Sequence, residues 1–269
     1  MENIRQAVER ARTDRGLPRS QIPANLAPQR PISINREASA ARITDDVKVG
    51  TEGLLARRIV TFDGADRRSR PYDMLRTQVV QSMDQNGWKI LGVTSPTPNC
   101  GKTLTAINLA FSIARQPQHS VVLADMDLRK PQIEKSFGLR LADRGVLDLL
   151  EERSTLQEAI VPICVKNQRI SLLPTLAADE PSELMNIAPM SNLLQDLRRD
   201  FQTVILDLPP MLSCDDVFRI LPQIDCVLLV AAVGVSKVSE VEECVRHLPS
   251  QLIRLVLNKS SEASLDYYY

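Results

Sequence analysis

The chain has little cysteine, few aromatic residues and no long apolar run. Its longest apolar stretch, residues 226–235, is of strand length and falls well short of the ~20 residues that a helix needs to cross a bilayer. The cysteines form no C-x-x-C pair and have no histidine at metal-binding spacing, which argues against a zinc or redox motif. Their number, five, is odd, so we expect free thiols in a reducing cytoplasm: Cys100, Cys164, Cys214, Cys226 and Cys244.

An excess of one charge sign is also missing. The 33 basic and 33 acidic residues cancel, so no overall field attracts nucleic acid or anionic lipid, and we predict no nucleic-acid partner. There are only two histidines, His119 and His247, and neither has an acid or a nucleophile at a spacing that supports catalysis. No apolar leader follows Met1, so we expect a soluble protein without a signal peptide.

Length and composition set limits on the domain organisation. The 269 residues suffice for one α/β domain of about 200 residues and an arm, and a hydrophobic share of 43% is enough for its core. Residues 1–60 are predicted to form a short charged helix and a linker interrupted by Pro18, Pro23, Pro28 and Pro31. Residues 61–260 are the predicted folded domain, and residues 261–269 are a polar tail that ends in three tyrosines.

Strand and helix patterns alternate from residue 89 onward, after a helical pattern over residues 71–83. Strands are predicted near residues 89–94, 120–125, 169–173, 203–208, 225–231 and 252–257. Helices are predicted near residues 102–115, 131–137, 145–150, 190–200, 216–221 and 238–247. This alternation is typical of a mainly parallel sheet with helices on both faces, in which ligands bind at the carboxyl ends of the strands.

The first of these strands leads into the segment Ser95–Thr103, which ends Gly101-Lys102-Thr103. A strand, a short loop with this ending and then a helix form the context of a phosphate-binding P-loop, so the fold class is predicted to be an α/β P-loop NTPase. Amides of the loop and of the helix N-terminus point at one spot and favour an anion there. Lys102 would then reach the β- and γ-phosphates, and the Thr103 hydroxyl would bind Mg²⁺.

The loop departs from the usual pattern at two positions. Pro96 stands where the first glycine of G-x-x-x-x-G-K-[ST] is expected, and Asn99 stands where a second glycine often lies. Asparagine tolerates a left-handed backbone better than other side chains, so it suits that position. The ATP contacts in this part of the chain are predicted to come from one continuous run: Pro98, Asn99, Cys100, Gly101, Lys102, Thr103 and Leu104.

Three aspartates follow predicted strands at the same edge of the sheet. Asp125 and Asp127 follow the second strand, and Asp207 ends the fourth strand, just before Leu-Pro-Pro. A triphosphate needs a cation to offset its charge, and Mg²⁺ prefers oxygen ligands or waters oriented by carboxylates. Any one of these aspartates is equally explained as a helix cap, but Asp-x-Asp-x-Arg, Asp-x-Pro-Pro and Gly-Lys-Thr together favour a nucleotide site. Metal contacts are therefore predicted for Thr103, Asp125 and Asp207.

With these motifs the chain resembles the bacterial tyrosine kinases (BY-kinases) of capsular and exopolysaccharide synthesis. Members carry a variant Walker A loop, a Walker A′ motif of an apolar run plus D-x-D-x-R, a Walker B motif of an apolar run plus D-x-P-P, and a tyrosine-rich C-terminus. The corresponding segments here are Ser95–Thr103, Val121–Arg129, Val204–Pro210 and Tyr267–Tyr269, and Pro181–Leu184 resembles the family's P-x-E-L segment. The likeness spans residues 65–269 and makes residues 61–260 a P-loop kinase domain.

The resemblance implies an ATP- and Mg²⁺-dependent tyrosine autokinase that regulates polysaccharide polymerisation and export. The chain is similar to members that are separate cytoplasmic proteins and rely on a membrane-embedded activator of the chain-length-regulator type. A homo-oligomer is therefore expected in the cytoplasm, at the inner face of the plasma membrane only through that partner. The implied phosphoacceptors are Tyr267, Tyr268 and Tyr269.

The resemblance also implies residue roles at the site. Lys102 would hold the phosphates, and Asp207 would orient the Mg²⁺ shell. Asp125 and Asp127 would share metal positioning and acceptance of the proton from the tyrosine hydroxyl, with the division between them left open. Asn258 resembles the position that contacts adenine, and a turn residue that ends the last strand explains it equally well.

One helix departs from the family's pattern. The interface helix of the family often shows E-x-x-R-x-x-R, whereas the matching residues here are Arg70, Asp73 and Arg76, with the acid and one base exchanged. These charges either pair across a ring of subunits or lie on a solvated helix face.

Two other functions are also compatible with the residues. A P-loop ATPase switch of the partitioning or site-placement type usually has a second lysine near the start of the loop, where this chain has Thr97, which counts against it. The other is a scaffold of the polysaccharide machinery that binds nucleotide without kinase activity, which Pro96 and Asn99 keep open.

Overall fold

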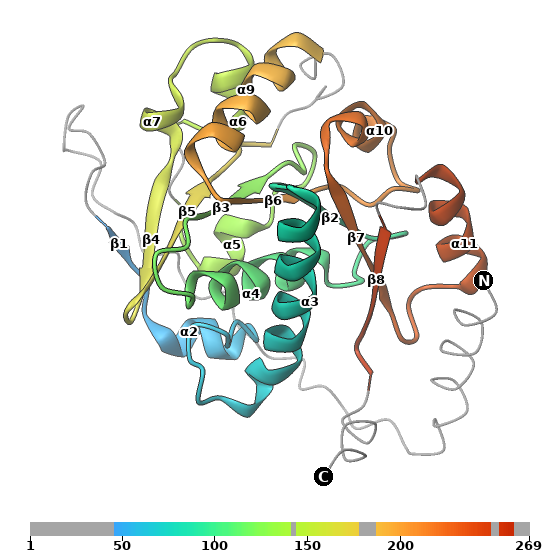
Figure 1. The fold of residues 1–269 in the computed structure, drawn as a ribbon, viewed down its shortest axis with the longest axis horizontal. Coiled ribbons are helices and arrows are strands. Elements are labelled where there is room, and N and C mark those ends of the chain that lie inside the picture. The colour runs from blue at the N-terminus through green and yellow to red at the C-terminus, as the bar shows by residue number, and fades with distance from the viewer. Residues whose placement is uncertain (1–45, 141–143, 178–186, 249–252, 261–269) are drawn as a thin grey trace.

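The computed structural model describes residues 46–140, 144–177, 187–248 and 253–260, which form an eight-stranded sheet between two layers of helices (Figure 1). The strands are β1 (Val47–Lys48), β2 (Ile90–Thr94), β3 (Val121–Asp125), β4 (Val161–Val165), β5 (Gln168–Leu173), β6 (Thr203–Asp207), β7 (Cys226–Ala232) and β8 (Ile253–Asn258). The α-helices are α2 (Thr51–Ala56), α3 (Arg70–Asn86), α4 (Lys102–Ala114), α5 (Ile133–Phe137), α6 (Val146–Leu150), α7 (Leu156–Ala159), α9 (Ile187–Asp200), α10 (Asp216–Ile220) and α11 (Val238–His247). Two short 3-10 helices, η1 (Arg67–Ser69) and η2 (Leu221–Gln223), precede α3 and follow α10.

The sheet places the carboxyl ends of its central strands side by side. Its strand order is β1-β4-β5-β3-β6-β2-β7-β8, and every neighbouring pair is parallel except the antiparallel pair of β4 and β5. The strand before the P-loop, β2, lies between β6 and β7. Asp125 at the end of β3 is the register partner of Asp207 at the end of β6. The predicted mainly parallel α/β fold is confirmed.

Alternation along the central strands builds two separate cores. In β2, Leu91 and Val93 pack into a cluster with side chains of α3 and α4, whereas Ile90 joins a cluster with α9, α10 and α11. The same alternation divides β3, where Leu123 faces the first cluster and Val122 the second. Successive strand residues point to opposite faces, so a strand that is apolar throughout is buried on both. The predicted helical cover of both faces is therefore confirmed.

The folded domain begins earlier than the predicted boundary at residue 60. Within the predicted linker, β1 pairs with β4, and Leu54 of α2 is fully buried. The amide of Val60 donates to Asn108 Oδ1 on α4 (2.9 Å), and Thr61 Oγ1 donates to the Asn108 carbonyl (2.6 Å). Residues 46–60 are thus part of the domain, because their contacts are made with elements far along the chain. The predicted helix over residues 2–14 lies outside the described residues.

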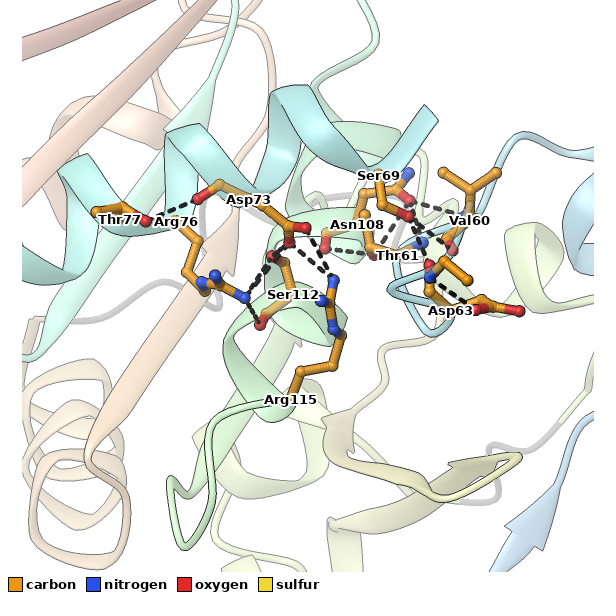
Figure 2. A network of polar contacts seen from close by, with 11 residues as sticks. Val60, Thr61, Asp63, Ser69, Asp73, Arg76, Thr77, Asn108, Ser112 and Arg115 are labelled. Carbon is orange, nitrogen blue, oxygen red and sulfur yellow. Dashed lines mark hydrogen bonds and ion pairs between the residues drawn. The ribbon is translucent and has the colours of Figure 1, made fainter. Parts of the chain in front are cut away.

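Two of the exchanged charged residues on α3, Asp73 and Arg76, form hydrogen bonds with the end of α4 (Figure 2). Asp73 Oδ1 accepts hydrogen bonds from Ser112 Oγ (2.6 Å) and Arg115 Nη1 (2.8 Å), both at the C-terminal end of α4. Arg76 Nη1 lies 3.3 Å from the same carboxylate oxygen and donates to the Ser112 carbonyl (3.0 Å). Asp73 and Arg76 therefore join α3 to the P-loop helix. Of the three residues with exchanged charges, Arg70 alone is exposed.

This network contradicts the expectation of a solvated helix face, and pairing across a ring of subunits stays a prediction. Asp73 and Arg76 have side chains only 24% and 19% exposed, so they do not form a solvated face. Asp73 Oδ1 and Arg76 Nη1 are engaged at the end of α4, which leaves these two atoms poorly available to a neighbouring subunit. The exchange of acid and base is accounted for by local packing, because Asp73 lies between two arginines that approach from different helices.

Candidate nucleotide-binding site

The P-loop joins β2 to α4 through two residues with left-handed backbone. Asn99 has φ 65° and Gly101, the N-cap of α4, has φ 90°. Asparagine and glycine adopt this conformation most readily, so the prediction for Asn99 is confirmed. Inside the loop, Ser95 Oγ donates to the Thr97 carbonyl (2.9 Å), and Cys100 Sγ lies 3.1 Å from the same oxygen. The loop is therefore held by its own hydrogen bonds although Pro96 replaces a glycine.

The residues after β8 hold the loop from outside. Asn258 Nδ2 donates to the Cys100 carbonyl (2.9 Å), and Lys259 Nζ donates to the Asn99 carbonyl (2.8 Å). A Cβ at Gly101 would lie 2.3 Å from Asn258 Nδ2, so a side chain is excluded there by contact as well as by φ. Asn258 is thus at the site, as predicted, with its amide donated to the P-loop backbone; its contact with adenine stays a prediction. Lys259 was missed, although it directly follows Asn258.

Lys102 and Thr103 converge with two of the predicted aspartates. Lys102 Nζ lies 3.1 Å from Asp127 Oδ2 and 3.2 Å from Asp207 Oδ1. Thr103 Oγ1 donates to Asp207 Oδ2 (2.6 Å). Burial disfavours the charged form of Lys102, but the two carboxylates more than offset this, so the pKa of the ammonium is above its ordinary value. Lys102 is therefore a fixed cation at the carboxyl end of the sheet.

Asp125 is the third aspartate of this cluster, and it also caps a helix. Its Oδ2 accepts from the amides of Gln132 and Ile133, both at 3.0 Å, where α5 begins. Burial, and then the charge of Asp207, raise the pKa of Asp125 to about 8 despite these hydrogen bonds. Burial likewise raises the pKa of Asp207. Both explanations of a strand-end aspartate thus hold for Asp125, which is a cap and a member of the charged cluster.

The charge balance of the cluster fits a divalent cation. Three acidic side chains face a single ammonium group in this cluster, and the four residues are at most 8% exposed. Because the pKa of Asp125 is raised to about 8, an added cation would favour its charged form. Among the residues that the structure describes, no three His, Cys, Asp or Glu side chains form a metal cage by themselves. An ion here would take oxygens from phosphate and water to complete its shell, as Mg²⁺ commonly does. The residues that would hold it are Thr103 and Asp207, with Asp125 adjoining.

The remaining predicted site residues divide into two groups. Pro98 and Leu104 lie in the loop and at the start of α4, and Leu104 packs its side chain against the core. The tail residues Tyr267–Tyr269 and the segment Pro181–Leu184 lie outside the described residues. Asp216 was missed by the sequence prediction. It receives Arg129 of the Asp-x-Asp-x-Arg motif in an ion pair of 2.6 Å.

A family model described as AAA domain matches residues 89–247, more than half of the chain. The chain belongs to this AAA-domain family. The matched segment runs from one residue before β2 to the end of α11, so it contains the P-loop and the three aspartates. Family membership assigns this P-loop to nucleotide binding. Separately, none of the described helices combines the length and the apolarity that a bilayer crossing requires.

Curated relatives of this AAA-domain chain are tyrosine kinases by name. Tyrosine-protein kinase CpsD of Streptococcus pneumoniae serotype 4 is 27% identical over 70% of this chain and 82% of its own length. The putative tyrosine-protein kinase EpsB of Ralstonia nicotianae is 30% identical over 72% of this chain. The match covers 25% of EpsB, so the chain spans about a quarter of the length of that relative.

Solved structures agree with these relatives. The kinase domain of the Escherichia coli tyrosine kinase ETK superposes with a TM-score of 0.62 at 25% identity, covering 76% of this chain and 81% of that one. A ParA family ATPase from Chlorobium tepidum covers 64% of this chain and 74% of its own at a TM-score of 0.53 and 16% identity, and so shares the fold alone. The resemblance to bacterial tyrosine kinases is confirmed.

Proposed function

We propose that the chain is an ATP- and Mg²⁺-dependent protein-tyrosine autokinase that phosphorylates its own C-terminal cluster, Tyr267, Tyr268 and Tyr269. The observation that carries the proposal is the cluster of Lys102, Thr103 and three buried aspartates at the end of β2, β3 and β6. The kinase names of the relatives support it. Regulation of exopolysaccharide or capsule polymerisation and export is the role that follows from the family likeness.

The side chains divide the work of phosphoryl transfer. Bound ATP·Mg²⁺ supplies the γ-phosphoryl group and offsets its charge. Lys102 binds the phosphates, and Thr103 and Asp207 hold the metal. The phosphoryl group passes to the tyrosine oxygen, ADP leaves, and the phenolic proton goes to a carboxylate. We assign that proton to Asp127, because it is the less buried of the two, at 6% exposed against 1% for Asp125, and its Oδ2 lies 3.1 Å from the phosphate-binding Lys102. Both oxygens of Asp125 accept from backbone amides, two of them where α5 begins.

The surroundings of the kinase are part of the same proposal. The chain would work in the cytoplasm at the inner face of the plasma membrane, where a membrane-embedded activator of the chain-length-regulator type holds it. It would form a homo-oligomer in which one subunit presents its tail to the next. Three phosphotyrosines add about five negative charges to each tail, which would loosen its contact with an acidic site.

Mass spectrometry of the tail after incubation with ATP and Mg²⁺ tests the function. The wild-type chain, alone and co-purified with its membrane partner, should acquire phosphate on the C-terminal tyrosines. Lys102→Ala should lose this signal, because Lys102 is the buried ammonium that would bind the phosphates. A Lys130→Ala control, altered at an exposed lysine near the site, should keep it.

Two outcomes would contradict the kinase and point elsewhere. ATP hydrolysis without phosphotyrosine, with and without the membrane partner, would indicate an ATPase switch. Nucleotide binding without either activity would indicate a scaffold. The structure gives the ATPase switch no added support, since the position of its second lysine is taken by Thr97, whose neutral side chain lies 3.8 Å from Cys100 Sγ within the loop.

A further inference from the structure

Arg129 lies at the rim of the candidate site and is held on one side only. Its Nε donates to Asp216 Oδ2 (2.6 Å), and its Nη2 donates to Oδ1 (3.3 Å). Asp216, the first residue of α10, is 2% exposed, whereas the Arg129 side chain is 41% exposed. Within the described part of the chain, Nη1 has no hydrogen-bond partner. The guanidinium is thus fixed in direction, with its outer edge turned to solvent.

The ion pair of Arg129 with Asp216 contributes little to the stability of the fold. Burial of the Asp216 carboxylate costs desolvation, and an ion pair with a partly exposed arginine returns little of it. The arrangement instead presents an oriented donor fork two residues beyond Asp127. Guanidinium groups of this kind bind carboxylates and phosphates with two parallel hydrogen bonds. A carboxylate or phosphate that enters the site beside Asp127 is therefore a suitable ligand for Arg129.

The segment that follows β6 and leads to Asp216 contacts the P-loop and carries an exposed apolar side chain, Leu212. The amides of Met211 and Leu212 donate to the carbonyls of Ser95 (2.8 Å) and Pro96 (3.1 Å). Leu212 leaves 39% of its surface exposed although it is apolar. A tyrosine ring gains from apolar contact, and Leu212, four residues before Asp216, is an exposed apolar side chain on this segment.

We propose that Arg129, oriented by Asp216, determines acceptor specificity by binding an acidic group directly before the tyrosine. This inference rests on the proposed kinase function. In the chain's own tail, the residue before Tyr267 is Asp266, a carboxylate. Arg129 is a binding residue in this scheme, and Asp216 is a positioning residue that acts through it.

The scheme gives the tail an order of modification. Tyr268 and Tyr269 are each preceded by a tyrosine, which becomes anionic only after it is phosphorylated. The reaction therefore begins at Tyr267, and each phosphate prepares the next acceptor. Mass spectra taken over time should show the singly modified tail phosphorylated at the first tyrosine of the cluster.

Two tail peptides test the inference on the full chain whose three tail tyrosines are changed to phenylalanine. Both contain one tyrosine, preceded in one by aspartate and in the other by asparagine. The enzyme should use the aspartate peptide with about tenfold higher kcat/KM, mostly through KM, as expected for one charge-assisted contact. Arg129→Gln should remove this preference. The control Lys130→Gln, at the adjacent exposed cation, should keep it.

Further variants separate a binding role from a structural one. Arg129→Glu should favour a peptide with lysine before the tyrosine, which loss of structure cannot produce. Asp216→Asn should raise KM for the aspartate peptide and reduce its advantage over the asparagine peptide, because Arg129 loses the carboxylate that orients it. If Arg129→Gln does not fold, the double variant Arg129→Gln/Asp216→Asn removes the unpaired buried charge and should again show no preference.

The possible outcomes test the role of Arg129 separately from the proposed kinase function. Equal use of the two peptides by the enzyme, or a preference that survives Arg129→Gln, would overturn the inference and leave the kinase standing. Failure to phosphorylate either peptide or the wild-type tail, with ATP binding intact, would overturn the kinase and the inference together.

Discussion

Removal of the Asp73 carboxylate should destabilise the fold, and the size of the effect follows from its contacts. Asp73 accepts one hydroxyl and two guanidinium hydrogen bonds, from Ser112, Arg115 and Arg76. Hydrogen bonds to a charged group contribute about 1.5–3 kcal/mol each when shielded. The ion pairs here are 19–24% exposed and are partly screened. We therefore expect Asp73→Ala to lower the free energy of unfolding by about 2–3 kcal/mol in total.

Urea unfolding and thermal denaturation measure this loss. For a domain of this size it corresponds to a fall in Tm of roughly 4–10 °C. Asp196→Ala is the matched control, since Asp196 pairs with Arg199 at the same i,i+3 spacing on α9, with side chains 45% and 68% exposed. That pair should contribute less than about 0.5 kcal/mol.

The same variant distinguishes an internal network from a subunit contact. If the charges of α3 served mainly to join subunits, Asp73→Ala would reduce the sedimentation coefficient and leave the unfolding of the separated subunit unchanged. The internal contacts predict the reverse, with altered unfolding and unaltered assembly. A stability change below about 0.5 kcal/mol would refute the internal account, because it would equal that of an exposed pair.

Three further predictions concern the site and its support. Because the native pKa of Asp125 is raised from 3.8 to about 8, the stability that its protonated form gives at low pH is lost as pH rises through that window. In thermal denaturation without nucleotide, the Tm of Asp125→Asn should therefore rise relative to that of wild type between pH 5 and 9. A Tm difference that stays constant over this range would contradict the prediction. Asn108→Ala should cost about 2–4 kcal/mol in urea unfolding, because its side chain satisfies the buried amide of Val60; a cost below 1 kcal/mol would contradict it. Lys259→Ala, which frees the Asn99 carbonyl, should raise KM for ATP about three- to tenfold in the kinase assay while Tm stays within 2 °C; an unchanged KM would contradict it.

The sequence was sufficient for the parts of the fold whose signals are local. The buried strands β2, β3, β6 and β7 are runs of apolar residues, and each of their ends lies within one residue of the prediction. The site followed from the same signals, because parallel strands bring their carboxyl ends to one edge and so place Asp125 opposite Asp207.

The missed elements depend on partners far along the chain. Strand β4 contains Pro162, which argues against a strand, yet it pairs with Ser171 of β5 in an antiparallel hairpin. The edge strand β1 pairs with Ile163 and Cys164 of β4 and not with Pro162. The two residues of β1 have no signal of their own and are a strand only because β4 lies beside them. Helix α2 is six residues long and contains Gly53, so its burial against the core, not its propensity, explains it.

Side-chain partners were the least predictable feature. The pairing of Arg129 with Asp216 joins residues 87 apart, and no spacing in the sequence indicates it. The internal use of Asp73 was hidden for the same reason, since Ser112 and Arg115 lie on another helix. A charge pattern along one helix does not show which face will meet another element.

The hydrogen bonds from Asn258 and Lys259 connect the P-loop to the segment that follows β8. The last described residue, Ser260, follows directly, so the peptide that bears the tyrosines departs from a point tied to the Asn99 and Cys100 carbonyls. A shift of those carbonyls on nucleotide binding or release would move Asn258 and Lys259 through the two hydrogen bonds, and with them the start of the C-terminal segment. We therefore expect nucleotide exchange at the P-loop to change the position of Ser260, because only these two hydrogen-bonding residues stand between them.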